Sequence, residues 1–112
     1  MRSEKLYLTD ILEAADAIRR FCHGKSLEDF IKDEMCQGAV LQKLTIIGEA
    51  AAHLSPEFKS AHGNIEWVDI VGFRNIAVHE YFSVVWDIVW TTATMEVPLL
   101  RQQIDSILAD EF

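Results

Sequence analysis

The hydrophobic and polar positions of this chain alternate mainly with the period of a helix. In the first segment the apolar residues recur at three- and four-residue steps, and charged residues occupy the other faces. This spacing is typical of an amphipathic helix. The apolar positions are Leu8, Ile11, Leu12, Ala15, Ile18 and Cys22. We expect Ser3 or Thr9 to cap this helix and Gly24 to end it.

Two further helices are expected before the middle of the chain. Ser26 and Asp29 have the spacing of a capping box in which the second residue is acidic, which predicts a short helix. That helix should end near Met35 or run on into the next. The third helix is expected over roughly residues 37–54, where an apolar face repeats with the helical period. Small residues on it, Gly48 among them, would let another helix approach closely.

Proline and asparagine residues indicate where helices begin and end in the second half of the chain. Pro56 should end the third helix, because the residue before a proline disfavours the helical conformation. Asn64 is expected to cap a further helix that begins at Ile65. The last helix should cover roughly residues 84–109, with Pro98 kinking or splitting it because its ring removes one backbone hydrogen bond.

Residues 81–90 are the one segment with a competing interpretation. They are rich in valine and aromatic residues, which favours a strand. No second run of this kind exists to pair with it, and a lone strand is not stable. We therefore expect a helix here. The whole pattern predicts an all-α protein, with residues 1–112 as a single domain and an up-and-down bundle of roughly four to five helices.

The charge balance narrows the classes of function. The 112 residues include 10 Lys plus Arg against 18 Asp plus Glu, a net charge of -8. This argues against a nucleic-acid binder that works through a broad basic surface. It leaves room for an enzyme that meets RNA at one small cationic site, and it fits a partner protein with a basic face.

Other sequence features exclude further classes. The N-terminus has no apolar signal region, and no run approaches the roughly 20 apolar residues of a membrane span. We expect a cytoplasmic protein with no membrane span. Cys22 and Cys36 have no neighbouring base and are expected to be inert, reduced thiols. The four histidines lack metal-ligand spacing, so no metal site is expected, and His62 should lie on an exposed loop.

Arg74 is the residue that most needs an explanation. It is the only Lys or Arg between Lys59 and Arg101, and apolar residues surround it. A cation in such a setting costs desolvation energy unless something compensates. On a helix, Arg74 and Tyr81 would share one face, and Asn75 and His79 an adjacent one. An imidazole that moves protons and a guanidinium that binds phosphate are a minimal set for cleaving RNA without a metal.

A purely structural interpretation competes with this one. Arg74 would be buried and paired with a carboxylate such as Glu49, and His79 would be satisfied by a backbone carbonyl. Composition and spacing alone favour this structural interpretation.

The order of motifs adds a resemblance to a known family. Arg74, four residues, His79, one residue and Tyr81 resemble the Arg-x4-His-x-Tyr motif of HepT-like toxins of the HEPN superfamily. The resemblance covers essentially the whole chain. Its other elements are the opening helix of residues 7–20, Ile47-Gly48-Glu49-Ala50, Trp67-Val68-Asp69-Ile70-Val71-Gly72, Arg74-Asn75 and Ile88-Val89-Trp90. The chain departs from the common pattern at Phe73, where a methionine is frequent, and in the apolar run of residues 83–87.

The resemblance implies an all-α HEPN fold and a homodimer with two motif copies facing each other across a cleft. It implies the toxin of a toxin–antitoxin pair, a metal-independent endoribonuclease that needs no cofactor. The antitoxin would be a small nucleotidyltransferase, which in some members transfers AMP to the motif tyrosine. The implied roles are Arg74 and His79 as the catalytic pair, Asn75 as their support, Tyr81 as the modification site, and Glu49 and Asp69 as secondary candidates.

Two other functions stay open at this point. The chain would be a non-catalytic binding module, the dimeric partner of a nucleotidyltransferase, if Arg74 and Tyr81 served only contact and modification. The strong acidity favours this version over a broad RNA binder. Alternatively, it would be a plain helical interaction domain in which Arg74 and Glu49 form a fully buried pair.

Overall fold

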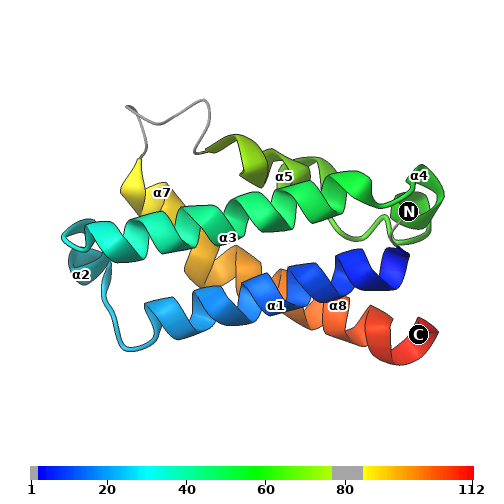
Figure 1. Ribbon diagram of the computed structural model, residues 1–112, viewed down its shortest axis with the longest axis horizontal. Helices are drawn as coiled ribbons and strands as arrows, with labels where there is room; N and C mark the ends of the chain where they lie inside the picture. Colours follow the sequence, from blue (N-terminus) through cyan, green and yellow to red (C-terminus); the bar gives the residue numbers. More distant parts are fainter. Residues whose placement is uncertain (1–2, 77–84) are drawn as a thin grey trace.

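The computed structural model describes residues 3–76 and 85–112. This part of the chain consists of helices, turns and loops, with no strand (Figure 1). The predicted all-α class is therefore confirmed. Two of the residues singled out above, His79 and Tyr81, lie outside the described residues.

The helices form an elongated bundle. Helices α1 and α3 lie side by side along its length, α8 packs on α1, and α5 with the turn η1 packs on α3 (Figure 1). The elements in order are α1 Glu4–Cys22, α2 Leu27–Ile31, α3 Glu34–His53, α4 Pro56–Ala61, α5 Trp67–Gly72, the 3-10 turn η1 Phe73–Asn75, α7 Trp86–Thr91, the π-helical turn η2 Thr92–Glu96, and α8 Val97–Glu111.

The core lies where α1, α3 and α8 meet. Its fully buried side chains come from the apolar faces that the spacing predicts, and each contributes about 1.5–3 kcal/mol of burial free energy. They include Leu8, Ile11, Ile18, Val40, Leu44, Ile47, Leu100 and Ile104. The helical period of the sequence is thus explained by one shared core.

The first helix begins and ends at local signals. Ser3 is the N-cap, and its hydroxyl accepts a hydrogen bond from the backbone N–H of Leu6. Thr9 is not a cap, because it lies inside α1 and its hydroxyl donates to the carbonyl of Lys5. Gly24 adopts a φ of 74° just beyond the helix, a left-handed conformation that only glycine takes without cost.

The junction between α2 and α3 differs from the prediction. The capping box of Ser26 and Asp29 is present with both of its hydrogen bonds. Helix α2, however, ends at Ile31, and α3 begins at Glu34 rather than near residue 37. Asp33 separates the two helices, since its carboxylate accepts the backbone N–H of Cys36 at 3.0 Å and caps α3.

The predicted start of the helix after the His62 turn is also wrong. Asn64 does not cap it; α5 begins at Trp67 after Glu66, which makes no side-chain cap bond. Trp67 and Ile70 are buried, and the Trp67 indole donates to the carbonyl of His62 at 3.0 Å. Packing of these apolar side chains therefore sets the start of α5, with no capping residue to mark it.

The C-terminal segment is helical from Trp86, which confirms helix over strand for the described part of residues 81–90. Trp86 and Trp90 pack on Phe30, with ring centroids 5.9 and 5.2 Å away. The interruption predicted at Pro98 takes the form of the π turn η2, directly before α8. Pro98 has no N–H for the carbonyl of Thr94, so the helix widens there. None of the described helices has the length and hydropathy needed to cross a membrane.

Candidate functional site

The backbone of Arg74 lies directly on Gly48. Arg74 belongs to η1, which follows α5 and packs on the middle of α3. A Cβ atom placed on Gly48 would stand 2.5 Å from the Arg74 nitrogen, 2.9 Å from the Arg74 Cβ and 2.9 Å from the Val71 carbonyl oxygen. Only glycine fits at this contact. The small residues of α3 were expected to admit a close neighbour, and that neighbour is the segment that carries Arg74.

Arg74 forms an ion pair with Glu49. Its Nη1 lies 3.4 Å from the Glu49 Oε1, and the two side chains are 38% and 52% exposed. Glu49 follows Gly48 in the sequence, so one turn of α3 both contacts the Arg74 backbone and binds the Arg74 side chain. The structural interpretation named the right partner but the wrong environment, because the pair lies at the surface.

This exposure changes what the arginine can do. A guanidinium carries five N–H donors, and within the described residues Glu49 is the sole hydrogen-bond partner of the Arg74 side chain. The remaining donors can form the two-pronged contact that guanidinium makes with phosphate. The single 3.4 Å contact to Glu49 orients the group and leaves most of its binding capacity for a ligand.

The other candidates fall into three groups. Asn75 is exposed and follows Arg74 on the same turn. Asp69 is exposed on α5, and its side chain forms no hydrogen bond or ion pair with any other residue in 3–76 or 85–112. The catalytic role predicted for His79 and the modification predicted for Tyr81 concern residues outside the described part. The structure therefore brings Arg74, Glu49 and Asn75 together, and no side-chain bond within the described residues links Asp69 to them.

A groove beside the ion pair holds two aromatic rings. It has a volume of about 350 Å³ and lies between α1 and α3. His53 stacks on Tyr7 with ring centroids 5.3 Å apart. The His53 Nδ1 lies 2.8 Å from the carbonyl oxygen of Glu49. A carbonyl only accepts, so Nδ1 is the donor in this contact.

Tyr7 and His53 were not among the site residues expected from the sequence. The signal for His53 is its spacing of four residues from Glu49, which puts both on one stripe of α3. Nothing in the sequence relates Tyr7 to that stripe, because the contact forms between two separate helices. Aromatic rings at a surface groove, here one that Glu49 also lines, are the kind of surface on which a nucleic-acid base can lie.

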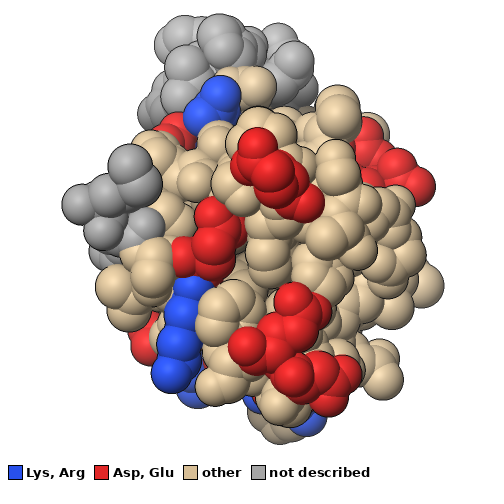
Figure 2. Space-filling view, turned by 90° about the vertical axis from the view of Figure 1, so that its right-hand side faces the viewer, with Lys and Arg blue, Asp and Glu red and all other residues tan. Residues whose placement is uncertain are grey.

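The charge of the surroundings is mainly negative. Figure 2 shows the end of the bundle that carries α4, where acidic side chains spread over the face and basic ones lie toward its edges. This face offers no broad basic platform for nucleic acid, as the net charge of -8 predicts. Within residues 3–76 and 85–112, no three His, Cys, Asp or Glu side chains come together as a set of metal ligands.

Comparison with known proteins gives a consistent set of similarities. A family model described as "Ribonuclease HepT-like" matches residues 11–107. A protein of Caldanaerobacter subterraneus named "Putative RNase" is 38% identical, with 99% of both chains covered. A protein of Thermococcus cleftensis named "Probable ribonuclease HepT" is 36% identical, with 95% of this chain and 96% of its own covered. No solved structure matches the chain.

Proposed function

Because this chain belongs to the HepT-like ribonuclease family, we propose that it is an endoribonuclease, the toxin of a toxin–antitoxin pair. One structural observation carries the proposal. Arg74, which opens the Arg-x4-His motif, is held at the surface by Gly48 beneath its backbone and by Glu49 beside its guanidinium. A cation fixed in this way is preorganised for a phosphate.

Arg74 binds the scissile phosphate of the RNA. Its planar guanidinium donates to two phosphate oxygens at once and stabilises the negative charge that grows on them during the reaction. Glu49 is a positioning residue in this scheme, because it contacts the guanidinium and not the substrate. Asn75, the next residue on η1, supports the motif by hydrogen bonding, and Asp69 is a secondary candidate.

His79 moves the proton. As a base it takes the proton of the ribose 2′-OH, and the freed oxygen attacks the neighbouring phosphorus. A bond forms between this oxygen and phosphorus, the bond from phosphorus to the 5′-oxygen breaks, and a proton is returned to that leaving oxygen. The products are a 2′,3′-cyclic phosphate and a 5′-hydroxyl. No metal or cofactor takes part, since an internal nucleophile replaces activated water.

A homodimer completes the proposed site. Two motif copies that face each other across a cleft would double the positive charge at the cleft of a protein whose chain has a net charge of -8. This is the way a protein without a broad basic surface would hold an RNA strand. The dimer interface would then also be the place where the substrate is cleaved.

The proposed partner is a small nucleotidyltransferase antitoxin that transfers AMP to Tyr81. The modification would add a bulky, negatively charged group two residues from His79. It would compete with the RNA phosphate for Arg74 and fill the space that the substrate needs. A toxin that acts on cellular RNA under this control would work in the cytoplasm.

Growth of cells that express the protein tests the proposed function. Expression of the wild type should arrest growth, and His79→Ala or Arg74→Ala should relieve the arrest at equal protein levels. Glu28→Gln is the matched control, because Glu28 is exposed on α2 and is no part of the proposed site, so this variant should leave the arrest intact. Equal growth of the wild-type and His79→Ala strains would refute the toxin assignment.

The acidity favours a second candidate, a non-catalytic module that is the dimeric partner of a nucleotidyltransferase. A net charge of -8 suits a partner with a basic face better than it suits RNA. Co-expression with a nucleotidyltransferase followed by intact mass measurement separates the two functions. AMP on Tyr81, with no RNA cleavage by the unmodified protein, is the result that this second candidate requires.

A further inference from the structure

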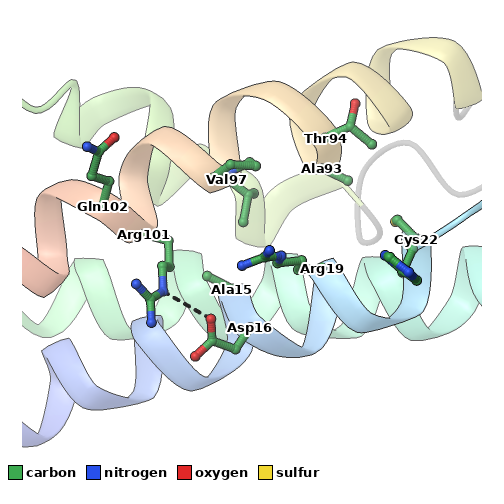
Figure 3. Close-up of a pocket in the computed structure, with 11 residues that line it drawn as sticks. Ala15, Asp16, Arg19, Cys22, Ala93, Thr94, Val97, Arg101 and Gln102 are labelled. Carbon is green, nitrogen blue, oxygen red and sulfur yellow. Dashed lines mark hydrogen bonds and ion pairs between the residues drawn. The ribbon is translucent and has the colours of Figure 1, made fainter.

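A second groove lies between α1 and the C-terminal helical segment, away from Arg74. It has a volume of about 460 Å³, within the range of roughly 300–1,000 Å³ typical of small-molecule sites. Figure 3 shows its walls, with α1 on one side and η2 and α8 on the other. The residues that line it are Ala15, Asp16, Arg19, Cys22, His23, Ala93, Thr94, Val97, Pro98, Arg101 and Gln102.

Arginines gather around this groove. Of the four arginines in the described part of the chain, Arg19 and Arg101 line the groove and Arg20 lies next to Arg19. Arg101 is paired with Asp16 at 3.0 Å and with Asp105 at 3.7 Å. In Figure 3 the Arg19 side chain extends between the ribbons of α1 and α8.

Arg19 is the cation that remains available. Among the residues that the structure describes, neither Arg19 nor Arg20 forms an ion pair or a side-chain hydrogen bond. Asp16 is the only carboxylate that lines the groove, and it already binds Arg101. The groove is therefore a locally basic place on an acidic protein, which favours an anionic ligand.

The floor of the groove is apolar. Ala15, Ala93 and Val97 line it with small apolar side chains that are almost completely buried. Thr94 and Gln102 add polar groups at the edge. The Thr94 hydroxyl donates to the Trp90 carbonyl at 2.7 Å, which leaves its lone pairs free to accept. An apolar floor with a few polar groups and a cation is the usual composition of a site for a small organic anion.

We propose that this groove binds a nucleoside phosphate, with the base over the apolar floor and the phosphate on Arg19. The ligand can be a free mononucleotide or one unit of an RNA strand, since both present the same chemistry. The site is formed by α1, η2 and α8, whereas Arg74 belongs to η1, which packs on α3. It is therefore separate from the proposed cleavage site and does not depend on cleavage.

Amide chemical shifts in the ¹⁵N-labelled wild-type protein test this proposal. Titration with adenosine 5′-monophosphate should shift the amides of Ala15, Ala93 and Val97 in a saturable way. Adenosine without phosphate should bind at least about tenfold more weakly, because it lacks the charged contact to Arg19. A short fully 2′-O-methylated oligoribonucleotide, which lacks the 2′-OH and cannot be cleaved, tests the RNA strand as the source.

Two variants on α1 make the test specific. Arg19→Glu should weaken binding at the groove about tenfold or more. Lys5→Glu is the matched control, because it changes the net charge equally at the exposed far end of the same helix. If Arg19→Glu fails to fold, Arg19→Gln removes the charge with less disturbance and should weaken binding in the same direction.

The outcomes decide the proposal. Groove shifts with the mononucleotide identify a free nucleotide as a ligand, and shifts with the oligonucleotide alone identify an RNA strand. Either result, together with weaker binding by the Arg19 variant and unchanged binding by Lys5→Glu, supports the site. No shift at the groove with either ligand, or equal weakening by both variants, overturns it. Because no cleavage is measured, this result is independent of the test of the ribonuclease.

Discussion

Gly48 lies under the backbone of Arg74, so closely that a Cβ at position 48 would stand 2.5 Å from the Arg74 nitrogen. The next residue of α3, Glu49, binds the Arg74 side chain. Two adjacent residues of one helix thus fix both the backbone and the guanidinium of the motif arginine. The position of the cation depends on this contact as much as on the arginine itself.

Replacing Gly48 by alanine should both destabilise the protein and lower RNA cleavage. The atoms that the new methyl group would meet are backbone atoms and a Cβ, which cannot turn away. Overpacking of this kind costs about 1–3 kcal/mol. Urea unfolding should show a lower midpoint, and cleavage should fall further than the loss of folded protein explains, because η1 is displaced from α3.

Gly38→Ala is the matched control for this prediction. Gly38 lies on the same helix, but a Cβ there would meet nothing within 4 Å. Alanine should therefore stabilise α3 by about 0.5–1 kcal/mol and leave cleavage unchanged. Equal destabilisation by the two substitutions would mean that the close contact with Arg74 is not the cause.

Substitutions at the Arg74–Glu49 ion pair should lower RNA cleavage strongly while changing the free energy of unfolding little. Arg74→Ala should lower cleavage by about 100-fold or more, the usual cost of losing a donor to the developing charge. Glu49→Gln should lower it less, because Glu49 only positions the guanidinium. The free energy of unfolding should change by less than about 1 kcal/mol in either variant, since the pair is 38% and 52% exposed.

Cleavage assays and urea unfolding on the same preparations check this prediction. A fall of several kcal/mol in the free energy of unfolding of Glu49→Gln would contradict it, because only a buried ion pair loses that much stability when one partner is removed. Arg74→Lys adds a further check, since it keeps the charge but loses the planar fork, and it should cleave poorly.

The cap of α3 should make stability depend on pH. The backbone N–H of Cys36 and then the Lys25 ammonium bind the Asp33 carboxylate and lower its pKa below the usual 3.8. A folded-state pKa below the unfolded one stabilises the fold above the unfolded pKa. That contribution is lost as the pH falls through the folded-state pKa.

Unfolding midpoints of Asp33→Ala and the wild type should therefore differ at neutral pH and converge in acid below pH 3.8. Asp33→Asn is the control, because asparagine also caps helices but does not titrate. The difference in unfolding midpoint between Asp33→Asn and Asp33→Ala should therefore persist in acid. A gap between wild type and Asp33→Ala that stays constant from neutral to acid pH would exclude the carboxylate as its source.

Both thiols should react slowly in the folded protein. Burial first, and the neighbouring Cys36 second, raise the pKa of Cys22 from 9.0 to about 11. Burial also raises the pKa of Cys36, whose thiol donates to the Phe21 carbonyl at 3.6 Å. A pKa two units higher leaves about 100-fold less thiolate. Alkylation of Cys22 by iodoacetamide at pH 8 should be at least that much slower in the folded protein than in urea, and alkylation of Cys36 should also be slower. Mass spectrometry can follow both reactions, and equal rates with and without urea would contradict the burial of the thiols.

Helix ends were predictable from the sequence where a local signal sets them. Ser3, Ser26 and Gly24 act through hydrogen bonds or backbone angles within a few residues of themselves, so their roles follow from spacing. The start of α5 at Trp67 has no such signal, because burial of its side chains decides it. The environment of His62 was also not predictable from local sequence. We expected an exposed loop residue, but its side chain is only 16% exposed and pairs with Glu111 at 3.0 Å.

The pairing of Arg74 with Glu49 was predictable from the sequence, but the environment of the pair was not. The structural interpretation named Glu49 as a partner for Arg74, and the fold brings the two together across 25 positions. The apolar neighbours of Arg74 suggested burial, yet the tight turn η1 buries Phe73 and leaves the Arg74 side chain 38% exposed. Which way one residue points on a short turn depends on packing against α3, and no spacing rule contains that information.

Cleavage of a defined RNA by purified protein tests the central proposal most directly. Wild-type protein and His79→Ala should be compared in the presence of a chelator, with the ends of the products identified by mass spectrometry. We expect wild-type cleavage that leaves 2′,3′-cyclic phosphate ends, and a loss of about 100-fold or more in His79→Ala. Equal cleavage by the two proteins, or none by the wild type, would contradict a ribonuclease built on Arg74 and His79.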